Sequence, residues 1–209
     1  MFDFEESKNE RAIPGVIRRR REGANRMQDT PIELERLLLR RPKLEDAEIM
    51  HHSWANDTEV TKYLIWRPHK SLQETLSYLK FVSESWDNGT EFTWMICLKQ
   101  SSQPIGTISL RPEGFKAGMG YALSRHSWGN GFVFEAARKI IDLAFLHPQM
   151  YRVGGFCDVE NSRSARVMEK LGMQLEGTLK NWLIHPALGD RPRDCFSYSV
   201  TAHGARGQA

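Results

Sequence analysis

The sequence predicts an α/β domain with a mixed central sheet. Residues 91–99 and 104–110 read as two strands joined by a four-residue turn, which is a connection used between antiparallel strands. Residues 117–124 and 151–158 also read as strands, but a helical stretch separates them, as parallel strands require. Because both connections occur in one chain without an internal repeat, we expect one sheet of mixed direction covered by helices.

The first part of the domain is expected to hold one strand and two helices. Residues 37–40 form a short apolar strand, and residues 44–54 read as a helix with acidic residues in its first turn. After a loop at 63–69, Ser71 begins a second helix, with Glu74 at the spacing of a capping box. This helix has one apolar face, formed by Leu72, Leu76, Leu79, Val82 and Trp86.

The second part alternates strands and helices. A helix is predicted after residue 131, from an apolar stripe at Ala137, Ile140, Ile141, Ala144 and Phe145. Another helix runs from Ser162 to Leu171 and ends at Gly172. Leu175–Ile184 and Cys195–Thr201 complete the chain as strands. The expected total is about seven strands and four helices.

Composition limits the class of protein. With 209 residues and 40% hydrophobic content, the chain can bury one core. The net charge of +3 and the single basic run at 18–21 do not favour nucleic-acid binding. No apolar stretch approaches the ~18 residues of a membrane span, and no signal peptide is recognised. We therefore expect a cytoplasmic protein that contacts neither nucleic acid nor membrane.

The cysteines and the N-terminal segment support two further expectations. Three widely separated cysteines at 97, 157 and 195 read as reduced thiols, and no spacing of His, Cys or carboxylates suggests a metal site. Residues 1–30 lack apolar periodicity and are expected to form a disordered arm before a single domain at 31–209. The arm is either a tether to RNA, ribosome or membrane surface or a solvated tail, unless translation begins at Met27.

Residues 119–131 carry the strongest functional signal. A strand there runs into Trp128-Gly-Asn-Gly131, which opens a helix. Such a junction directs unpaired backbone N–H groups and the positive end of a helix at one point, where a phosphate can bind. The loop lacks the Gly-Lys of a Walker motif and follows the fourth strand, so it is neither a P-loop nor a Rossmann fingerprint. A phosphate-bearing ligand would then enter in the middle of the sheet.

Several motifs in a fixed order accompany this loop between residues 35 and 201. They are Gly106 in Ile-Gly-Thr-Ile, Gly120-Tyr-Ala-Leu, Trp128-Gly-Asn-Gly131, Glu135-Ala136, Arg152-Val, Asn161-x-x-Ser164, Glu169-Lys-Leu-Gly172-Met173, Glu176-Gly177 and Arg193-Asp194. With them the chain resembles the GNAT acetyltransferase superfamily, specifically its ribosomal-protein N-terminal acetyltransferase-like (RimJ/RimL-like) branch.

The resemblance implies that acetyl-CoA binds where the fourth and fifth predicted strands splay apart. Backbone groups of Tyr121, Ala122 and Leu123 would pair with the pantetheine arm, and one N–H would stabilise the oxyanion of the thioester. N–H groups of the loop would hold the pyrophosphate; these belong to Trp128, Gly129, Asn130, Gly131 and Phe132. Asn161 and Ser164 match positions that line the pantetheine and its sulfur, although Asn161 also fits a simple helix N-cap.

The resemblance also implies direct transfer of the acetyl group to an amine. Ser164 matches a serine proposed to protonate the departing thiolate. A glutamate that some relatives use as base is replaced here by Leu183, and His185 lies two residues further on the same strand face. His185 is therefore the candidate base, unless it is only a histidine at a loop edge. His51, His52 and His126 are further candidates, and His126 also replaces the Gln or Arg that often begins the family's loop.

The protonation state of amines at neutral pH limits which class of amine is the easier acceptor. An α-amine of pKa ~7.7–8.0 is roughly 10–15% neutral at pH 7, whereas a lysine is neutral in only about 0.04% of molecules. Without a strong base, a protein N-terminal α-amine is the easier acceptor. Trp66 and Arg67, in the loop that borders the acceptor cleft in relatives, are candidate substrate contacts, unless Trp66 only covers the edge of the core.

Two alternatives to this function remain. One keeps the chemistry but acetylates a small amine, such as an antibiotic, a polyamine or an amino-acid conjugate. The other is a non-catalytic acyl-CoA-binding or ribosome-docking module tethered by residues 18–21. An exposed edge strand would also make a homodimer unsurprising.

Overall fold

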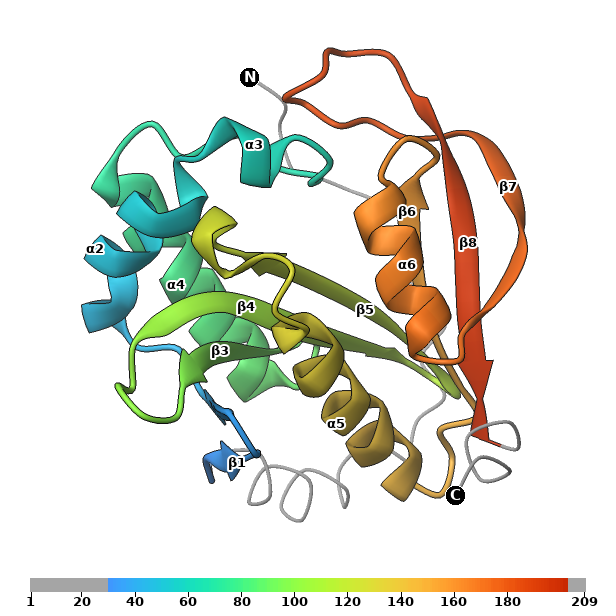
Figure 1. Cartoon of the computed structure of the whole chain (residues 1–209), viewed down its shortest axis with the longest axis horizontal. Coiled ribbons are helices and arrows are strands. Elements are labelled where there is room, and N and C mark those ends of the chain that lie inside the picture. Colours follow the sequence, from blue (N-terminus) through green and yellow to red (C-terminus); the bar gives the residue numbers. More distant parts are fainter. Residues whose placement is uncertain (1–29, 203–209) are drawn as a thin grey trace.

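In the computed structural model, residues 30–202 are described, and they build a mixed eight-stranded sheet with helices on both faces (Figure 1). The strand order is β1-β2-β3-β4-β5-β6-β8-β7. The strands are β1 (Ile32–Glu33), β2 (Leu37–Arg40), β3 (Phe92–Leu98), β4 (Pro104–Glu113), β5 (Lys116–Leu123), β6 (Arg152–Asp158), β7 (Gln174–Leu183) and β8 (Arg193–Thr201). The α-helices are α2 (Ala47–Met50), α3 (Thr58–Thr61), α4 (Leu72–Asn88), α5 (Phe132–Leu146) and α6 (Ser162–Lys170). Residues 1–29 of the expected arm, which include the arginine run and Met27, lie outside the described residues.

The α/β class and the mixed sheet are confirmed, and the element count is corrected. All seven expected strands are present, and β1 adds an eighth by pairing antiparallel with β2. The single helix expected over 44–54 is instead a 3₁₀ turn at Leu44–Asp46, the short α2, and a π-helix at His51–Ala55. Helix α3 was not expected. Asp57 begins it, because its side chain accepts a hydrogen bond from the backbone N–H of Glu59.

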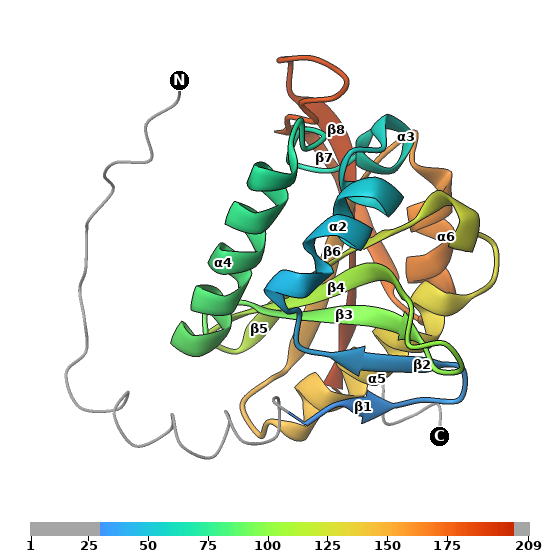
Figure 2. The same ribbon diagram turned by 90° about the vertical axis from the view of Figure 1, so that its left-hand side faces the viewer.

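The main helices sit on opposite faces of the sheet. Figure 2 shows α4 on one side and α5 and α6 on the other. Ser71 caps α4 as expected, since its hydroxyl accepts from the N–H of Glu74. The Glu74 carboxylate bonds the N–H of Lys70 rather than that of Ser71, so the capping box is displaced by one residue. Gly89 ends the helix in the left-handed conformation, with φ of 69°.

The sheet opens between β5 and β6, as the resemblance implied. These two strands are parallel, but they pair only over three residues, from Lys116 opposite Arg152 to Gly118 opposite Gly154. Beyond that point β5 stays with β4 through Leu123, while β6 stays with β8 through Asp158. The two strands therefore diverge toward their carboxyl ends, and Figure 1 shows β5 sloping away from the upright β6.

Gly106 allows β4 to pack closely against the end of β5, the strand that borders the gap. A Cβ at this position would lie 2.3 Å from the carbonyl oxygen of Ala122 and 2.9 Å from the Cα of Leu123. Only glycine permits this approach of β4 to the end of β5. The close contact fixes the backbone of the residues that edge the gap.

Among residues 30–202, no helix is long and apolar enough to cross a membrane.

Candidate active site

The gap between β5 and β6 exposes one edge of β5. In an extended strand, alternate residues direct their N–H and C=O groups to the same neighbour, and past Gly118 the neighbour on the β6 side is missing. The expected pantetheine contacts, Tyr121, Ala122 and Leu123, all lie in this unpaired part of β5. One of their groups is already used, because the indole N–H of Trp128 donates to the carbonyl of Leu123 at 2.8 Å.

The loop after β5 ends at an open helix N-terminus. Gly129 and Gly131 both adopt the left-handed conformation, with φ of 80° and 76°, where a side chain would be strained. Gly131 is the N-cap of α5, and no side chain caps the first N–H groups of this fifteen-residue helix. The amide of Asn130 instead donates to the carbonyls of Ser127 and Trp128. The helix N–H groups are therefore left for an anion.

Arg36, just before β2, holds this loop from outside. Its guanidinium donates to the carbonyl of Asn130 at 2.9 Å and to the carboxylate of Glu135 at 2.7 Å, and it stacks over the ring of Phe132 at 4.9 Å. The backbone N–H of Arg36 also donates to Glu135, at 2.9 Å. Because the Asn130 carbonyl is bound on this outer side, the loop is tied to both β2 and α5.

A second ion pair holds the start of the loop. Both the Nε and an Nη of Arg125 donate to one oxygen of Asp57, at 3.0 and 2.7 Å. Burial acts to raise the pKa of Asp57, but its hydrogen bonds with Arg125 and with the backbone lower it further than burial raises it. Asp57 stays charged and links the loop to the N-terminus of α3.

Across the gap, the N-terminus of α6 presents Ser164. Asn161 is the N-cap of this helix, since its side chain accepts from the N–H of Ser164 at 3.3 Å. The Ser164 hydroxyl lies 2.7 Å from the hydroxyl of Tyr121. Burial raises the pKa of Tyr121 to about 12, so its phenol stays protonated near neutral pH. Ser164 is thus fixed by one contact to its own helix and one to β5.

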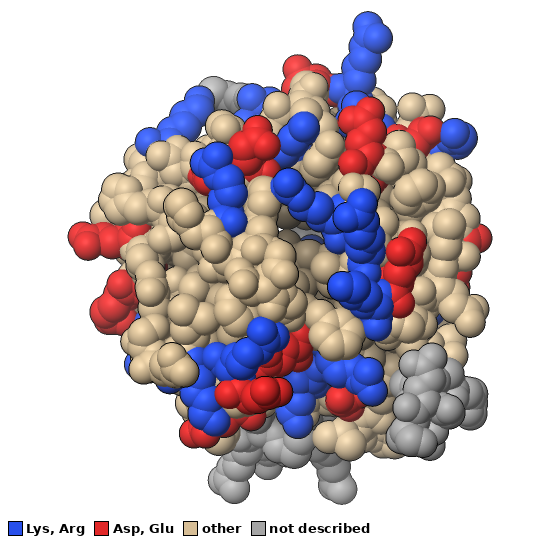
Figure 3. All heavy atoms as spheres, in the orientation of Figure 1, with Lys and Arg blue, Asp and Glu red and all other residues tan. Residues whose placement is uncertain are grey.

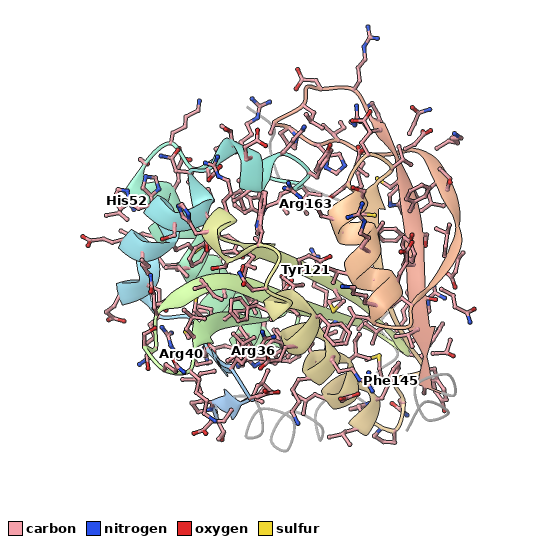
Figure 4. The ribbon with its side chains drawn as sticks, in the orientation of Figure 1. Arg36, Arg40, His52, Tyr121, Phe145 and Arg163 are labelled. Carbon is pink, nitrogen blue, oxygen red and sulfur yellow. The ribbon has the colours of Figure 1, made fainter. Side chains whose placement is uncertain are left out.

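Basic side chains gather around the opening of the gap. Figure 3 shows Lys and Arg around a hollow in the middle of the face that carries α5 and α6. Arg163 lies at this place in the same view (Figure 4), with its guanidinium 4.5 Å from the centre of the Trp128 ring. The cation of α6 and the loop of β5 therefore meet here, in surroundings that favour a polyanionic ligand.

His185 is buried, with 1% of its surface exposed. Its Nδ1 lies 3.4 Å from the carbonyl oxygen of Leu64, and its Nε2 lies 3.5 Å from a carboxylate oxygen of Asp158. Asp158 is itself fully buried and accepts from Arg193 at 2.5 and 3.2 Å. Burial acts to raise the pKa of Asp158, but its bonds to Arg193 keep it below the usual range. His185 is thus part of an internal network at the end of β6 and not a histidine at an exposed loop edge.

The loop at 62–70 meets the loop that follows β7. Exposed Arg67 pairs with Asp190 at 3.3 Å, and Leu64 contacts His185, so the two loops border one region. Trp66 is half-buried, and its ring centre lies 5.0 Å from that of His69 and 6.4 Å from that of Tyr78. Trp66 therefore packs against the core edge, whereas Arg67 faces solvent.

Of the other candidate histidines, His51 contacts Thr75 of α4, whereas His126 lies in the 3₁₀ turn that follows β5. His51 and His69 are buried, and each places its Nδ1 near the single hydroxyl of Thr75, at 3.2 and 2.9 Å. Burial lowers the pKa of His69. His52 and His126 are exposed. In residues 30–202, no group of three or more His, Cys, Asp or Glu side chains is placed to bind a metal.

Three features of the site were not predicted from the sequence. Glu135 was expected only as an acid in the first turn of a helix; it occupies that turn, but its carboxylate binds Arg36. The side chain of Tyr121 and the pairing of Asp158 with Arg193 were also missed. Each of these three interactions joins two residues that are between 35 and 99 positions apart in the sequence. The only sequence signal was that most of these residues fall within the motifs.

This arrangement suits transfer of an acyl group from a phosphate-bearing carrier. The helix N-terminus and the basic hollow can bind the phosphates, the free edge of β5 can bind an extended arm, and Ser164 can donate a hydrogen bond at its far end. The loops at 62–70 and 184–192 meet near Asp158 at the end of β6, so a second reactant can approach the gap from there.

Comparison with known proteins agrees with this reading. Residues 36–174 match the family model described as an acetyltransferase (GNAT) domain. An uncharacterized N-acetyltransferase of Bacillus licheniformis, p20, is 32% identical over 151 residues, which cover 71% of this chain and 84% of the relative. An uncharacterized N-acetyltransferase of Bacillus subtilis, YoaA, is 28% identical over 172 residues, covering 81% of this chain and 95% of the relative.

Solved structures share the fold. The ribosomal L7/L12 α-N-protein acetyltransferase RimL, in complex with CoA, has a TM-score of 0.73 and 19% identity, covering 82% of this chain and 98% of that chain. The microcin C7 self-immunity acetyltransferase MccE, in complex with acetyl-CoA and AMP, has a TM-score of 0.74 and 22% identity, covering 84% and 99%. At these identities the likeness shows the fold alone.

Proposed function

The chain belongs to the GNAT acetyltransferase family and is an acetyl-CoA-dependent N-acetyltransferase, and we propose that it acetylates the N-terminal α-amine of a protein. The motifs of the ribosomal-protein branch support this acceptor, and the fold shared with RimL is consistent with it. A non-catalytic binding module is not proposed for a member of this enzyme family.

Acetyl-CoA would bind in the gap between β5 and β6. The pyrophosphate would bind the N–H groups of residues 128–132, where α5 begins without a side-chain cap. The pantetheine arm would extend along the free edge of residues 121–123, and a free N–H there would bind the thioester oxygen. Asn161 would line the arm from the start of α6. Its role as N-cap fixes its side chain at this position.

The reaction proposed is direct transfer. The neutral amine attacks the thioester carbonyl, the C–N bond forms, and the C–S bond of the tetrahedral intermediate then breaks. Ser164 would hydrogen-bond the sulfur as negative charge develops on it. The amine loses one proton and the CoA sulfur finally gains one, so the products are the N-acetyl amine and CoA.

One observation supports an α-amine as the acceptor. Asp158, the buried carboxylate at the end of β6, forms an ion pair with Arg193 and lies beside His185. It is therefore not free to act as a base. Leu183 stands where some relatives have a glutamate. An acceptor that is already partly neutral at pH 7 is therefore favoured, and an α-amine has this property whereas a lysine does not.

His185 stays the candidate base of this proposal. It is covered by the carbonyl of Leu64 and the ring edge of Tyr63, whose centre lies 6.0 Å away. His185 can take a proton from the acceptor only when the 62–70 loop moves aside or when water connects them. Arg67, which is exposed on this loop, is the proposed contact for the acceptor chain, and Trp66 supports the loop from beneath.

A small amine is the second candidate acceptor. It is supported by MccE, whose structure is a complex with acetyl-CoA and AMP and matches this fold as well as RimL does. The fold thus allows both classes, and the loops at 62–70 and 184–192 would decide between them.

The test is CoA release from acetyl-CoA with a panel of acceptors. The panel pairs peptides beginning with Ala, Ser or Met with N-blocked peptides of the same sequence carrying lysine, and adds polyamines and aminoglycosides. Turnover confined to free N-termini is expected. Turnover confined to small amines would replace the proposed acceptor with the second candidate.

A further inference from the structure

The bond between Tyr121 and Ser164 joins the two sides of the open gap. Tyr121 lies on β5 and Ser164 in the first turn of α6, 43 residues later, and their hydroxyl oxygens are 2.7 Å apart. Figure 4 shows Tyr121 between β5 and α6. The proposed route of the pantetheine arm runs along the same part of β5, so this pair of hydroxyls would stand beside the thioester.

The direction of this bond decides what Ser164 can do. A hydroxyl has one proton to donate and can accept two hydrogen bonds. If Ser164 donated to Tyr121, it would have no proton left for the sulfur. If Tyr121 donates to Ser164, the serine proton is free to turn into the gap, and polarisation along the chain strengthens this second bond.

The acidities show that this is hydrogen bonding and not complete proton transfer. Burial raises the pKa of Tyr121 to about 12, while a thiol has a pKa of ~8.5. Moving a proton from the phenol to the thiolate is therefore disfavoured by roughly three orders of magnitude. A phenol that keeps its proton can, however, donate it in a hydrogen bond to Ser164.

We infer that Tyr121 is a positioning residue for thiolate departure: it donates to the Ser164 hydroxyl and thereby directs the serine proton to the sulfur of CoA. This role rests on the proposed function, in which Ser164 faces that sulfur. No proton leaves either hydroxyl for good; as the C–S bond breaks, the sulfur takes the electron pair, Ser164 stabilises it, and solvent later protonates the free thiolate.

The first experiment is a double-mutant cycle with Tyr121→Phe and Ser164→Ala. Each single variant is expected to lower kcat about five- to tenfold, the effect of one hydrogen bond, with little change in KM for acetyl-CoA. The double variant should be no slower than Ser164→Ala, because Tyr121 acts only through the serine. Tyr151→Phe, which removes a hydroxyl from an exposed tyrosine, is the matched control and should behave like the wild type.

Independent losses of kcat from the two substitutions would overturn the inference. If the two single effects multiply in the double variant, the hydroxyls act separately. If Tyr121→Phe raises KM for acetyl-CoA without lowering kcat, the tyrosine only shapes the cofactor site. A purely structural role would reduce the free energy of unfolding in parallel with kcat, so unfolding in urea is measured for each variant.

A second readout does not need the acceptor. The pKa of the CoA thiol is measured for CoA bound to the full chain, from the ultraviolet absorbance of the thiolate. Hydrogen bonding to the charged form lowers a pKa, so both Tyr121→Phe and Ser164→Ala should make the bound thiol less acidic, by about five- to tenfold and by the same amount. If the wild type acetylates nothing in the panel, the proposed acceptor fails, but this titration still decides on Tyr121. A thiol whose acidity responds to Ser164→Ala and not to Tyr121→Phe contradicts the inference.

Discussion

Replacing Glu135 with glutamine perturbs the support of the phosphate-binding loop without changing its shape. The carboxylate accepts from both the side chain and the backbone of Arg36, at 2.7 and 2.9 Å, and is 15% exposed. Hydrogen bonds to charged groups contribute ~1.5–3 kcal/mol, against about 1 kcal/mol for neutral ones. Because Arg36 is 46% exposed, solvent screens part of the difference. We expect a loss of ~1–2 kcal/mol of stability.

The effect on the cofactor follows from the same contacts. Arg36 also binds the carbonyl of Asn130, so a looser Arg36 lets the loop leave the conformation that presents its N–H groups. If ~1 kcal/mol of that ordering is lost, Kd for acetyl-CoA rises about fivefold. Urea unfolding and calorimetric titration measure the two effects, with Asp142→Asn on the exposed face of α5 as the matched control. Reduced stability with unchanged Kd would refute the argument, since Arg36 would then join β2 to α5 without ordering the loop.

Three further outcomes are expected. Gly106→Ala places a Cβ 2.3 Å from a backbone oxygen of β5 and should destabilise the fold by about 3 kcal/mol in urea unfolding, whereas Gly118→Ala, with nothing within 4 Å, should cost under ~0.5 kcal/mol. The bond to Arg152 lowers the pKa of Glu176 to about 2 from 4.5; a lowered carboxyl pKa stabilises the fold above ~4.5 and ceases to do so as the pH falls toward 2. Arg152→Gln should therefore flatten the dependence of the urea midpoint on pH in that window, and an unchanged slope would contradict this. Burial lowers the pKa of His69, so the unfolded chain binds more protons below pH ~6.5; stability should fall as the pH drops through that value, and less so in His69→Gln.

The main elements could be predicted because each carries its own local signal. The apolar stripe and the cap at Ser71 defined α4, and the glycine loop defined the start of α5. Strand β1, with two residues, is too short to show a period, and α3 has only four. The π-helix at 51–55 has the same apolar pattern as an ordinary helix, so its wider turn could not be read from spacing.

The site was predictable where it depends on the backbone and not where it depends on side chains from distant segments. Gly129 and Gly131 take the left-handed conformation that only glycine adopts easily, so their residue type already indicated the loop. The partnership of Arg36 with Glu135, 99 residues apart, leaves no comparable trace in a single sequence. His185 shows the same limit. Its position on the strand suggested an accessible base, but the chain of residues 63–64 covers it.

The two sides of the site differ in how firmly they are held, and this difference bears on function. On the cofactor side, Arg36 and Asp57 hold the loop through short hydrogen bonds, and Gly106 allows β4 to lie close to the end of β5. On the acceptor side, the two loops meet at buried His185, but their exposed parts are joined by the ion pair of Arg67 with Asp190, at 3.3 Å, which contributes little in water. A rigid cofactor side keeps the thioester in one geometry, whatever amine arrives. Loosely joined loops can adapt to the acceptor, so substitutions there should change acceptor preference while leaving the affinity for acetyl-CoA unchanged.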